Sequence, residues 1–82
     1  MKYGIRIKRS AEKELDILSD DIYNRIVDKI ISLKEEPRPH GSKKLKNKDG
    51  YRIRIGSYRV LYTIEEKEIE IYSVTHRKDA YK

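Results

Sequence analysis

Apolar and polar residues alternate at the start of the chain, as they do in a β-strand with one buried face. Tyr3, Ile5 and Ile7 fall on one side of such a strand, and Arg6 and Lys8 fall on the other. The chain is therefore expected to open with a strand whose apolar side joins a core.

The pattern then changes to the period of an α-helix. Ala11, Leu15 and Leu18 are spaced four and three residues apart, which places them on one helical face. Ser10 precedes them and is a good N-cap residue, so the sequence predicts that the first helix begins at about Ser10.

A second amphipathic segment follows directly. Its apolar stripe consists of Ile22, Ile26, Val27, Ile30, Ile31 and Leu33. Ser19, Asp20 or Asp21 is expected to cap this second helix, and Pro37 is expected to stop it. Because only a short link around Ser19 joins the two helices, they should form a helical hairpin.

Residues 37–50 are rich in proline, glycine and lysine and are expected to form a loop. Three strands should follow, at 51–55, 58–64 and about 68–76. The predicted order is β-α-α-β-β-β, which describes an α+β fold with an antiparallel sheet and a helical hairpin packed on one face. At 82 residues, the chain 1–82 should make a single domain.

The pair Gly56-Ser57 fixes the geometry of the first hairpin. Glycine in the first position favours a two-residue type II′ turn, which places Arg54 directly opposite Arg59 and Arg52 opposite Leu61. The arginines then share one face of the sheet. The other face, towards the helices, receives Ile53, Ile55, Tyr58, Val60, Tyr62 and Ile64.

The second hairpin turn is expected at 66–67, although Glu-Lys is not a strong turn pair. If the strands then pair without interruption, Leu61 faces Tyr72 and Arg59 faces Val74. Under this register the arginines' face also gains Tyr72, Val74 and His76, while Ile69 and Ile71 join the core.

Like charges placed directly across a sheet destabilise it by a few tenths up to about 1 kcal/mol. A cluster kept against its own repulsion favours a site for an anionic ligand. The alternative is that the arginine stems splay apart or that nearby carboxylates neutralise them. Those carboxylates, Glu65, Glu66, Glu68 and Glu70, belong to the far end of the hairpin.

The charge distribution supports a polyanionic partner. Net charge is +6 overall, and residues 37–59 alone carry eight basic side chains against one acidic side chain. A solvated surface that keeps a small protein soluble would explain the composition equally well. There is no cysteine and no apolar run long enough to span a membrane, so a cytoplasmic protein with no membrane partner is expected.

The stretches "YRIRIGSYRVLYTI" and "IYSVTHRKDAYK" together strongly resemble the RelE/ParE toxin superfamily of toxin–antitoxin systems, most of all the RelE type. The resemblance extends along essentially the whole chain and implies the RelE-like fold. It also implies a ribosome-dependent endoribonuclease (an mRNA interferase) that cuts messenger RNA in the A site. In that reaction the ribose 2′-OH attacks the adjacent phosphate, and no metal or other cofactor is needed.

The family's functional positions map onto residues of this sequence. The resemblance assigns catalysis to Arg52, Arg54, Arg59, Arg77 and Tyr81. RelE-type members often carry lysines where this chain has Arg52 and Arg54, and an arginine cannot readily give up a proton, so neither suits the general base.

Proton transfer needs titratable groups, and His76 and Tyr81 are the candidates. His76 has an ordinary pKa near neutrality, whereas Tyr81 could instead stack on a base. His76 could equally be a solvent-exposed residue at a strand end, and Tyr81 could pack back on the sheet. RNA contacts are expected from Lys43, Lys44, Lys46, Lys48 and Tyr72, since cations grip phosphates and flat rings stack on bases.

Three functions remain open at this stage. The first is the ribosome-dependent endoribonuclease, with ribosome and mRNA as partners. The second is a ParE-like poison of DNA gyrase on the same fold, and the third is a non-catalytic RNA-binding module. Either toxin function implies a small acidic antitoxin, RelB-like, that wraps the toxin and neutralises its arginines.

Overall fold

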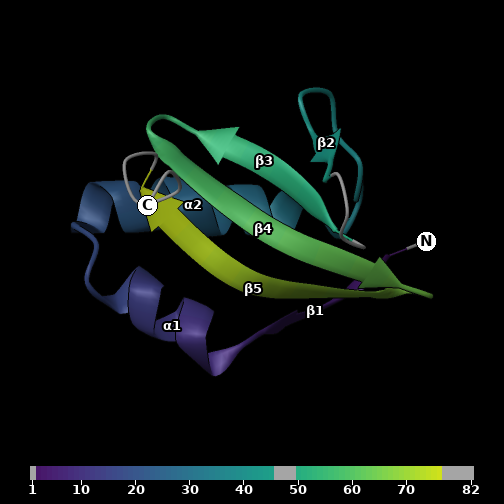
Figure 1. Cartoon of the computed structure of the whole chain (residues 1–82), viewed down its shortest axis with the longest axis horizontal. Coiled ribbons are helices and arrows are strands. Elements are labelled where there is room, and N and C mark those ends of the chain that lie inside the picture. The colour runs from purple at the N-terminus through teal and green to yellow at the C-terminus, as the bar shows by residue number, and fades with distance from the viewer. Residues whose placement is uncertain (1, 46–49, 77–82) are drawn as a thin grey trace.

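The computed structural model describes residues 2–45 and 50–76, which form two helices and a five-stranded sheet (Figure 1). The elements are β1 (Gly4–Ile7), α1 (Arg9–Asp16), α2 (Asp20–Ser32), β2 (Lys43–Lys44), β3 (Tyr51–Ile55), β4 (Tyr58–Glu65) and β5 (Glu68–His76). The sheet order is β1-β5-β4-β3-β2. The fold is α+β, as the sequence predicts.

Two features of the sheet were not predicted. β1 runs parallel to β5, with Gly4 beside Glu68 and Ile7 beside Ile71, so the sheet is mixed rather than wholly antiparallel. The segment expected to be a loop contains β2, a strand of two residues that pairs antiparallel with the start of β3. A strand this short leaves no alternation in the sequence by which to recognise it.

The β3–β4 hairpin has the predicted register. Ile55 pairs with Tyr58, and Arg54 pairs with Arg59. Gly56 has a φ of 60°, and the only described non-glycine residue with positive φ is Glu66. A positive φ in the first turn position alone is the signature of a type II′ turn, so the prediction is confirmed.

The β4–β5 hairpin follows the prediction only as far as Ile71. The register shifts between Leu61 and Tyr62, where β5 carries one extra residue, so Leu61 pairs with Ser73 instead of Tyr72. This β-bulge reverses the facing of every later residue in β5. The prediction that Val74 and His76 share the arginines' face is therefore wrong, because both lie on the side towards the helices.

The helices begin close to the predicted positions, but only α2 has an expected residue at its N-cap. α1 starts at Arg9, and Ser10 is already inside the helix, where its hydroxyl donates to the carbonyl oxygen of Tyr72 at 3.5 Å. Ser19 occupies the N-cap position of α2 without a side-chain capping bond. α2 ends at Ser32, followed by turns, before Pro37 is reached.

Both helices bury their apolar stripes against the same side of the sheet. Figure 1 shows α2 crossing behind β3 and β4, with α1 beside β5. The buried side chains of the core are Ala11, Leu15, Ile26, Ile30, Leu33, Ile53, Val60, Tyr62, Ile69, Ile71 and Val74. None of the buried strand residues lies on the opposite face of the sheet, which carries Arg52, Arg54 and Arg59.

α1 also closes an edge of the sheet that β1 leaves open. The β1–β5 pairing ends at Ile71, and beyond it the backbone N–H of Val74 donates to a carboxylate oxygen of Glu14 at 2.7 Å. A backbone donor at a sheet edge must find such a partner when water is excluded. α1 thereby substitutes for the missing length of β1.

Candidate nucleic-acid interface

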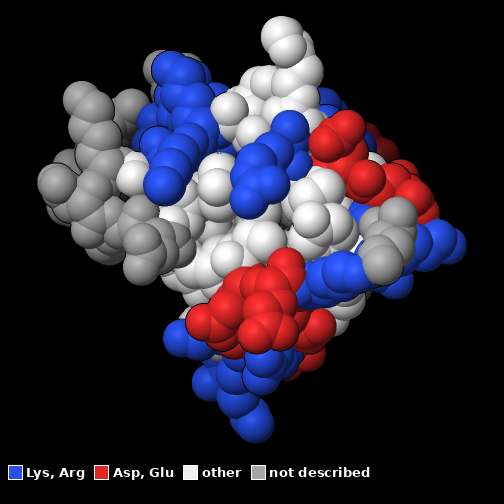
Figure 2. Space-filling view, turned by 90° about the vertical axis from the view of Figure 1, so that its right-hand side faces the viewer, with Lys and Arg blue, Asp and Glu red and all other residues white. Residues whose placement is uncertain are grey.

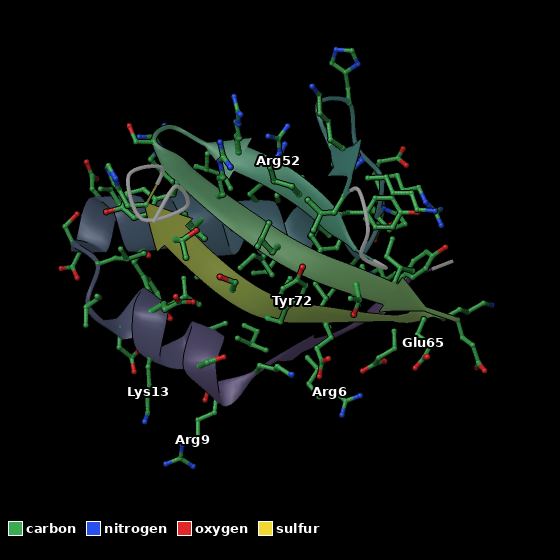
Figure 3. The ribbon with its side chains drawn as sticks, viewed as in Figure 1. Arg6, Arg9, Lys13, Arg52, Glu65 and Tyr72 are labelled. Atoms are coloured by element: carbon green, nitrogen blue, oxygen red, sulfur yellow. The ribbon has the colours of Figure 1, made fainter. Side chains whose placement is uncertain are left out.

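Cationic and hydroxyl side chains gather on the face of the sheet turned away from α2. We call this surface the arginine face; it consists of Lys43, Arg52, Arg54, Arg59, Leu61, Tyr72, Ser73 and Thr75. Residues paired directly across strands point to the same side, so the register assembles the whole group except Tyr72, the unpaired bulge residue. The same register continues this face through Thr63, Glu70 and Arg6 towards the β4–β5 turn. Figure 3 shows two of its members, Arg52 and Tyr72, over the sheet.

The arginine face has two cross-strand rows. In one row Arg54, Arg59 and Thr75 lie side by side on β3, β4 and β5. In the other row Lys43 of β2 stands next to Arg52 of β3. The sequence identified Lys43 as a candidate but not its alignment with Arg52, which depends on β2.

The arginines differ in how far they reach into solvent. Arg52 and Arg59 are partly buried, and their Nε atoms are shielded from water. Arg54 is exposed, and it forms no ion pair with any carboxylate in the part of the chain that the structure describes. A cation held at the surface in this way is available to a phosphate oxygen.

Tyr72 is the extra residue of the bulge and flanks the arginines. Its hydroxyl lies 3.2 Å from the place that a Cβ would take on Gly50, so the ring reaches across β4 towards the start of β3. Burial raises the pKa of Tyr72 above its ordinary value, which keeps the phenol protonated at neutral pH. Tyr72 thus offers a flat ring and a hydroxyl donor on this face.

The carboxylates of the hairpin lie away from the arginines. Glu70 is engaged with Arg6, Oε2 to Nε at 3.9 Å. Glu65 stands six positions along β4 from Arg59, about 20 Å at 3.3 Å per residue. Figure 3 shows Glu65 at the end where β4 finishes, and Figure 2, which views that end, shows carboxylates gathered there.

His76 lies on the other side of the sheet. It pairs with Tyr58, whose ring packs against the core, and the two rings meet edge to face with centroids 5.0 Å apart. The bulge at Tyr72 causes this placement, because without it His76 would face the same way as Arg59. The structure therefore brings together Arg52, Arg54, Arg59, Tyr72 and Lys43, but not His76.

Known proteins share both the sequence pattern and the fold. The family model for the ParE toxin of the type II toxin–antitoxin system parDE matches residues 5–81. The RelE1 protein of Methanocaldococcus jannaschii is 33% identical over 88 residues, covering 100% of this chain and 98% of that relative.

Solved structures agree with these sequence matches. The RelE–RelB complex of Pyrococcus horikoshii OT3 superposes with a TM-score of 0.84 at 32% identity, over 94% of this chain and 97% of the other. The RelBE2 toxin–antitoxin complex of Mycobacterium tuberculosis gives a TM-score of 0.83 at 28% identity, over 94% and 100%. The chain belongs to the RelE/ParE toxin superfamily. It is a toxin of a type II toxin–antitoxin system.

An aromatic clamp ties the segment that leads into β2 of this toxin to the sheet. The hydroxyl of Tyr62 donates to the carbonyl oxygen of Pro37 at 2.8 Å, and its ring stacks on Tyr51 with centroids 5.8 Å apart. Arg38 donates from Nε to the hydroxyl of Tyr51 at 3.0 Å. These contacts fix the chain on the approach to Lys43 and so hold this cation beside Arg52.

The pKa values of the two clamp tyrosines, Tyr62 and Tyr51, are shifted in opposite directions. Burial raises the pKa of Tyr62 to about 12. The hydrogen bond from Arg38 lowers the pKa of Tyr51, because it favours the charged form of the phenol. Tyr62 therefore stays protonated as a donor to Pro37 over the whole physiological range.

Four of the candidate residues of the toxin, Lys46, Lys48, Arg77 and Tyr81, lie outside the described residues. Within residues 2–45 and 50–76, no three His, Asp or Glu side chains cluster as ligands of a metal ion would. Neither α1 nor α2 is long and apolar enough to cross a membrane.

Sequence reasoning missed the hydroxyls of Ser73 and Thr75, which the bulge brings beside Leu61 and Arg59. The signal was present in the spacing of the buried residues of β5. Ile69 and Ile71 are two apart, but the next buried residue, Val74, is three further on. A change from two to three within a strand indicates an inserted residue.

Proposed function

We propose that this toxin is a ribosome-dependent endoribonuclease that cleaves messenger RNA in the ribosomal A site. The observation that carries the proposal is the pairing of Arg54 with Arg59, with Arg52 and Lys43 in the neighbouring row. Guanidinium groups grip phosphate oxygens in a two-pronged geometry, and four cations on one face suit a phosphodiester backbone. The family's RelE relatives make RNA the anion to test first.

The proposed reaction is an internal phosphoryl transfer. A base removes the proton of the ribose 2′-OH, and the resulting oxygen attacks the adjacent phosphorus. The bond from phosphorus to the 5′ oxygen breaks, leaving a 2′,3′-cyclic phosphate on one fragment and a 5′-OH on the other after protonation. Negative charge accumulates on the non-bridging oxygens, where Arg54 and Arg59 would stabilise it.

The arginine face itself supplies no proton acceptor. Arginine keeps its proton at any physiological pH, so Arg52 and Arg54 serve as charge stabilisers rather than bases. Of the two titratable candidates, His76 is directed to the far side of the sheet. Tyr81 is therefore our first candidate for proton transfer, with Arg77 as a further cation beside the phosphate.

Tyr72 is proposed to stack on a base of the bound RNA. Its hydroxyl reaches the start of β3 beside Gly50, two positions from Arg52. Base–aromatic stacking contributes about 1–3 kcal/mol per base without sequence preference. Lys43 and Lys44, with Lys46 and Lys48, are proposed to contact ribosomal RNA.

We also propose a small antitoxin partner. The P. horikoshii and M. tuberculosis relatives were both solved as toxin–antitoxin complexes. An acidic chain laid over the arginine face would neutralise its cations and block RNA at the same time. We expect a neighbouring gene to encode a small acidic protein. That protein should co-purify with this toxin.

The proposal is tested by incubating the purified toxin with ribosomes programmed with a defined mRNA and mapping the RNA ends. Cuts confined to the A site, with a cyclic phosphate upstream and a 5′-OH downstream, are expected. The same mRNA without ribosomes is the control. Absence of cuts on ribosomes would refute the nuclease.

The match to the ParE family model favours a second candidate, a poison of DNA gyrase. Such a toxin would stall DNA cleavage complexes and would not cut RNA itself. A parallel assay with gyrase and supercoiled DNA separates the two candidates. DNA breaks that depend on gyrase, with intact mRNA, would select the ParE-like function.

A further inference from the structure

A second cationic surface lies round the outer edge of β3 from the arginine face. It is a groove of about 620 Å³ between α2 and the end of β3. Its lining residues are Arg25, Asp28, Lys29, Ser32, Arg54, Ile55 and Gly56. Three cations and one carboxylate therefore surround a single open space.

The groove is accessible because the edge of β3 is uncovered there. β2 pairs only with Tyr51 and Arg52, so the outer edge of the following residues carries no neighbouring strand among the described elements. Arg25 reaches from α2 to the β3–β4 turn, since its Nη2 lies 4.0 Å from where a Cβ of Gly56 would stand. Arg25 and Arg54 thus both line the groove beside this turn.

The cations of the groove are not used by the fold. Within the described residues, none of Arg25, Lys29 and Arg54 forms an ion pair, although Asp28 lines the same groove. The hydroxyl of Ser32 is engaged with the carbonyl oxygen of Lys29 at 2.6 Å. Positive charges grouped without a structural partner point to an anion from outside the chain.

Arg54 belongs to both surfaces, because it stands in the arginine row and also lines the groove. We infer that the groove between α2 and β3 is a second phosphate-binding subsite, occupied by the same RNA strand as it passes from the arginine face over the edge of β3. The inference rests on the proposed function and extends it: Arg25 and Lys29 hold backbone phosphates at a distance from the bond that is cut. Phosphate contacts of this kind position an RNA without reading its sequence.

The experiment compares the binding of two single-stranded RNAs by fluorescence anisotropy. One RNA has about four nucleotides, enough for the arginine face, and the other has about sixteen. The Arg25→Ala/Lys29→Ala variant should bind the long RNA roughly tenfold more weakly, with a salt dependence shallower by about 1.4 in log–log slope. Its affinity for the short RNA should equal that of the wild type.

The chain offers a matched control on the other helix. Arg9 and Lys13 of α1 have the same identities and the same four-residue spacing as Arg25 and Lys29, and both are exposed. Figure 3 shows them pointing away from the sheet. The Arg9→Ala/Lys13→Ala variant loses the same charge and should bind both RNAs as the wild type does.

Three results would overturn the inference. If both double variants weaken binding of the long RNA equally, the effect is one of net charge. If Arg25→Ala/Lys29→Ala changes neither RNA while Arg54→Ala/Arg59→Ala abolishes binding, the arginine face stands and the groove does not belong to it. If the wild type binds neither RNA yet cuts mRNA on programmed ribosomes, the groove inference fails while the proposed function stands; if it also fails to cut on ribosomes, both fail.

Discussion

Arg54 and Arg59 place two positive charges directly across a strand pair, where a sheet selected for stability alone would avoid them. The arrangement has a measurable consequence. Replacing Arg54 by Thr removes the repulsion and introduces a residue that suits strands. We expect Arg54→Thr to raise the free energy of unfolding by a few tenths up to about 1 kcal/mol, measured by urea denaturation, while weakening RNA binding.

Arg6 is the control residue for this measurement, because it faces an opposite charge. It is also a strand arginine, but its cross-strand neighbour is Glu70, with Nε and Oε2 3.9 Å apart. Arg6→Thr removes an exposed attraction, so the free energy of unfolding should fall by about 1 kcal/mol or less. If Arg54→Thr and Arg6→Thr shift stability in the same direction, repulsion between the arginines is not a feature of this sheet.

The ionisation of Tyr62 is linked to the free energy of unfolding. Its pKa is about 12 in the folded protein, against about 10 in an unfolded chain, so the folded state holds the phenolic proton more tightly. The stabilisation is complete below pH 10 and is lost as the pH rises from about 10 to 12. Unfolding free energies measured across this range should fall, partly because ionised Tyr62 can no longer donate to Pro37.

Tyr62→Phe separates this contribution from the rest. The variant should be about 1 kcal/mol less stable near neutral pH, because the carbonyl oxygen of Pro37 loses its donor. It should also show a smaller fall between pH 10 and 12. An identical fall in the wild type and in Tyr62→Phe would mean that the ionisation of Tyr62 is not linked to unfolding.

At the scale of the elements, β5 is a central strand with neighbours on both edges. It pairs with β1 and β4, and where β1 ends it is covered by α1. Glu14→Ala leaves the part-buried N–H of Val74 without its acceptor, which should lower the free energy of unfolding by about 1–3 kcal/mol. Amide hydrogen exchange should show the loss of protection at Val74 itself.

Glu12 is the control on the same helix, because it is exposed and its side chain forms no hydrogen bond or ion pair with β5 within the described residues. Glu12→Ala should change stability by about 0.5 kcal/mol or less and leave the protection of Val74 unchanged. Equal effects from the two substitutions would show that Glu14 contributes only its helix propensity or charge, and not a bond to the edge of β5.

The same elements show what sequence reasoning can recover. The β3–β4 register followed from a single glycine, because Gly56 fits a turn that admits only one pairing. The bulge at Tyr72 was missed because the alternation was continued past Ile71 without regard to the spacing of Val74. Ser10 was expected to cap α1 from its residue type, yet its hydroxyl bonds to Tyr72, a partner 62 residues away that no local rule contains.

At the scale of the whole molecule, the fold gathers cations from separate parts of the chain. Cations occupy the arginine face and the groove beside α2, while Glu65, Glu66 and Glu68 lie at the β4–β5 turn. Figure 2 shows acidic and basic side chains side by side at that end of the molecule. The composition shows a basic central segment but cannot show that Arg25 of α2 joins it across the turn at Gly56. A concentration of cations of this kind attracts a polyanion before contact is made.

The candidate site was therefore predictable where it depends on local pairing and not where it depends on tertiary contacts. Arg52, Arg54 and Arg59 share a face as expected. Lys43 was an expected RNA contact, but its position beside Arg52 depends on a strand of two residues; a one-residue bulge turns His76 to the other face of the sheet. In a sheet, a single inserted residue is enough to move a side chain from one surface to the other.

The most direct test of the account is the rate of mRNA cleavage on programmed ribosomes by Arg59→Ala and Tyr81→Ala, measured with ribosomes saturated by toxin. If the scissile phosphate lies on the arginine face, each substitution should lower the cleavage rate about 100-fold or more, with the position of the cut unchanged in whatever cleavage remains. Cleavage by both variants at the wild-type rate would contradict the placement of the reaction on this face.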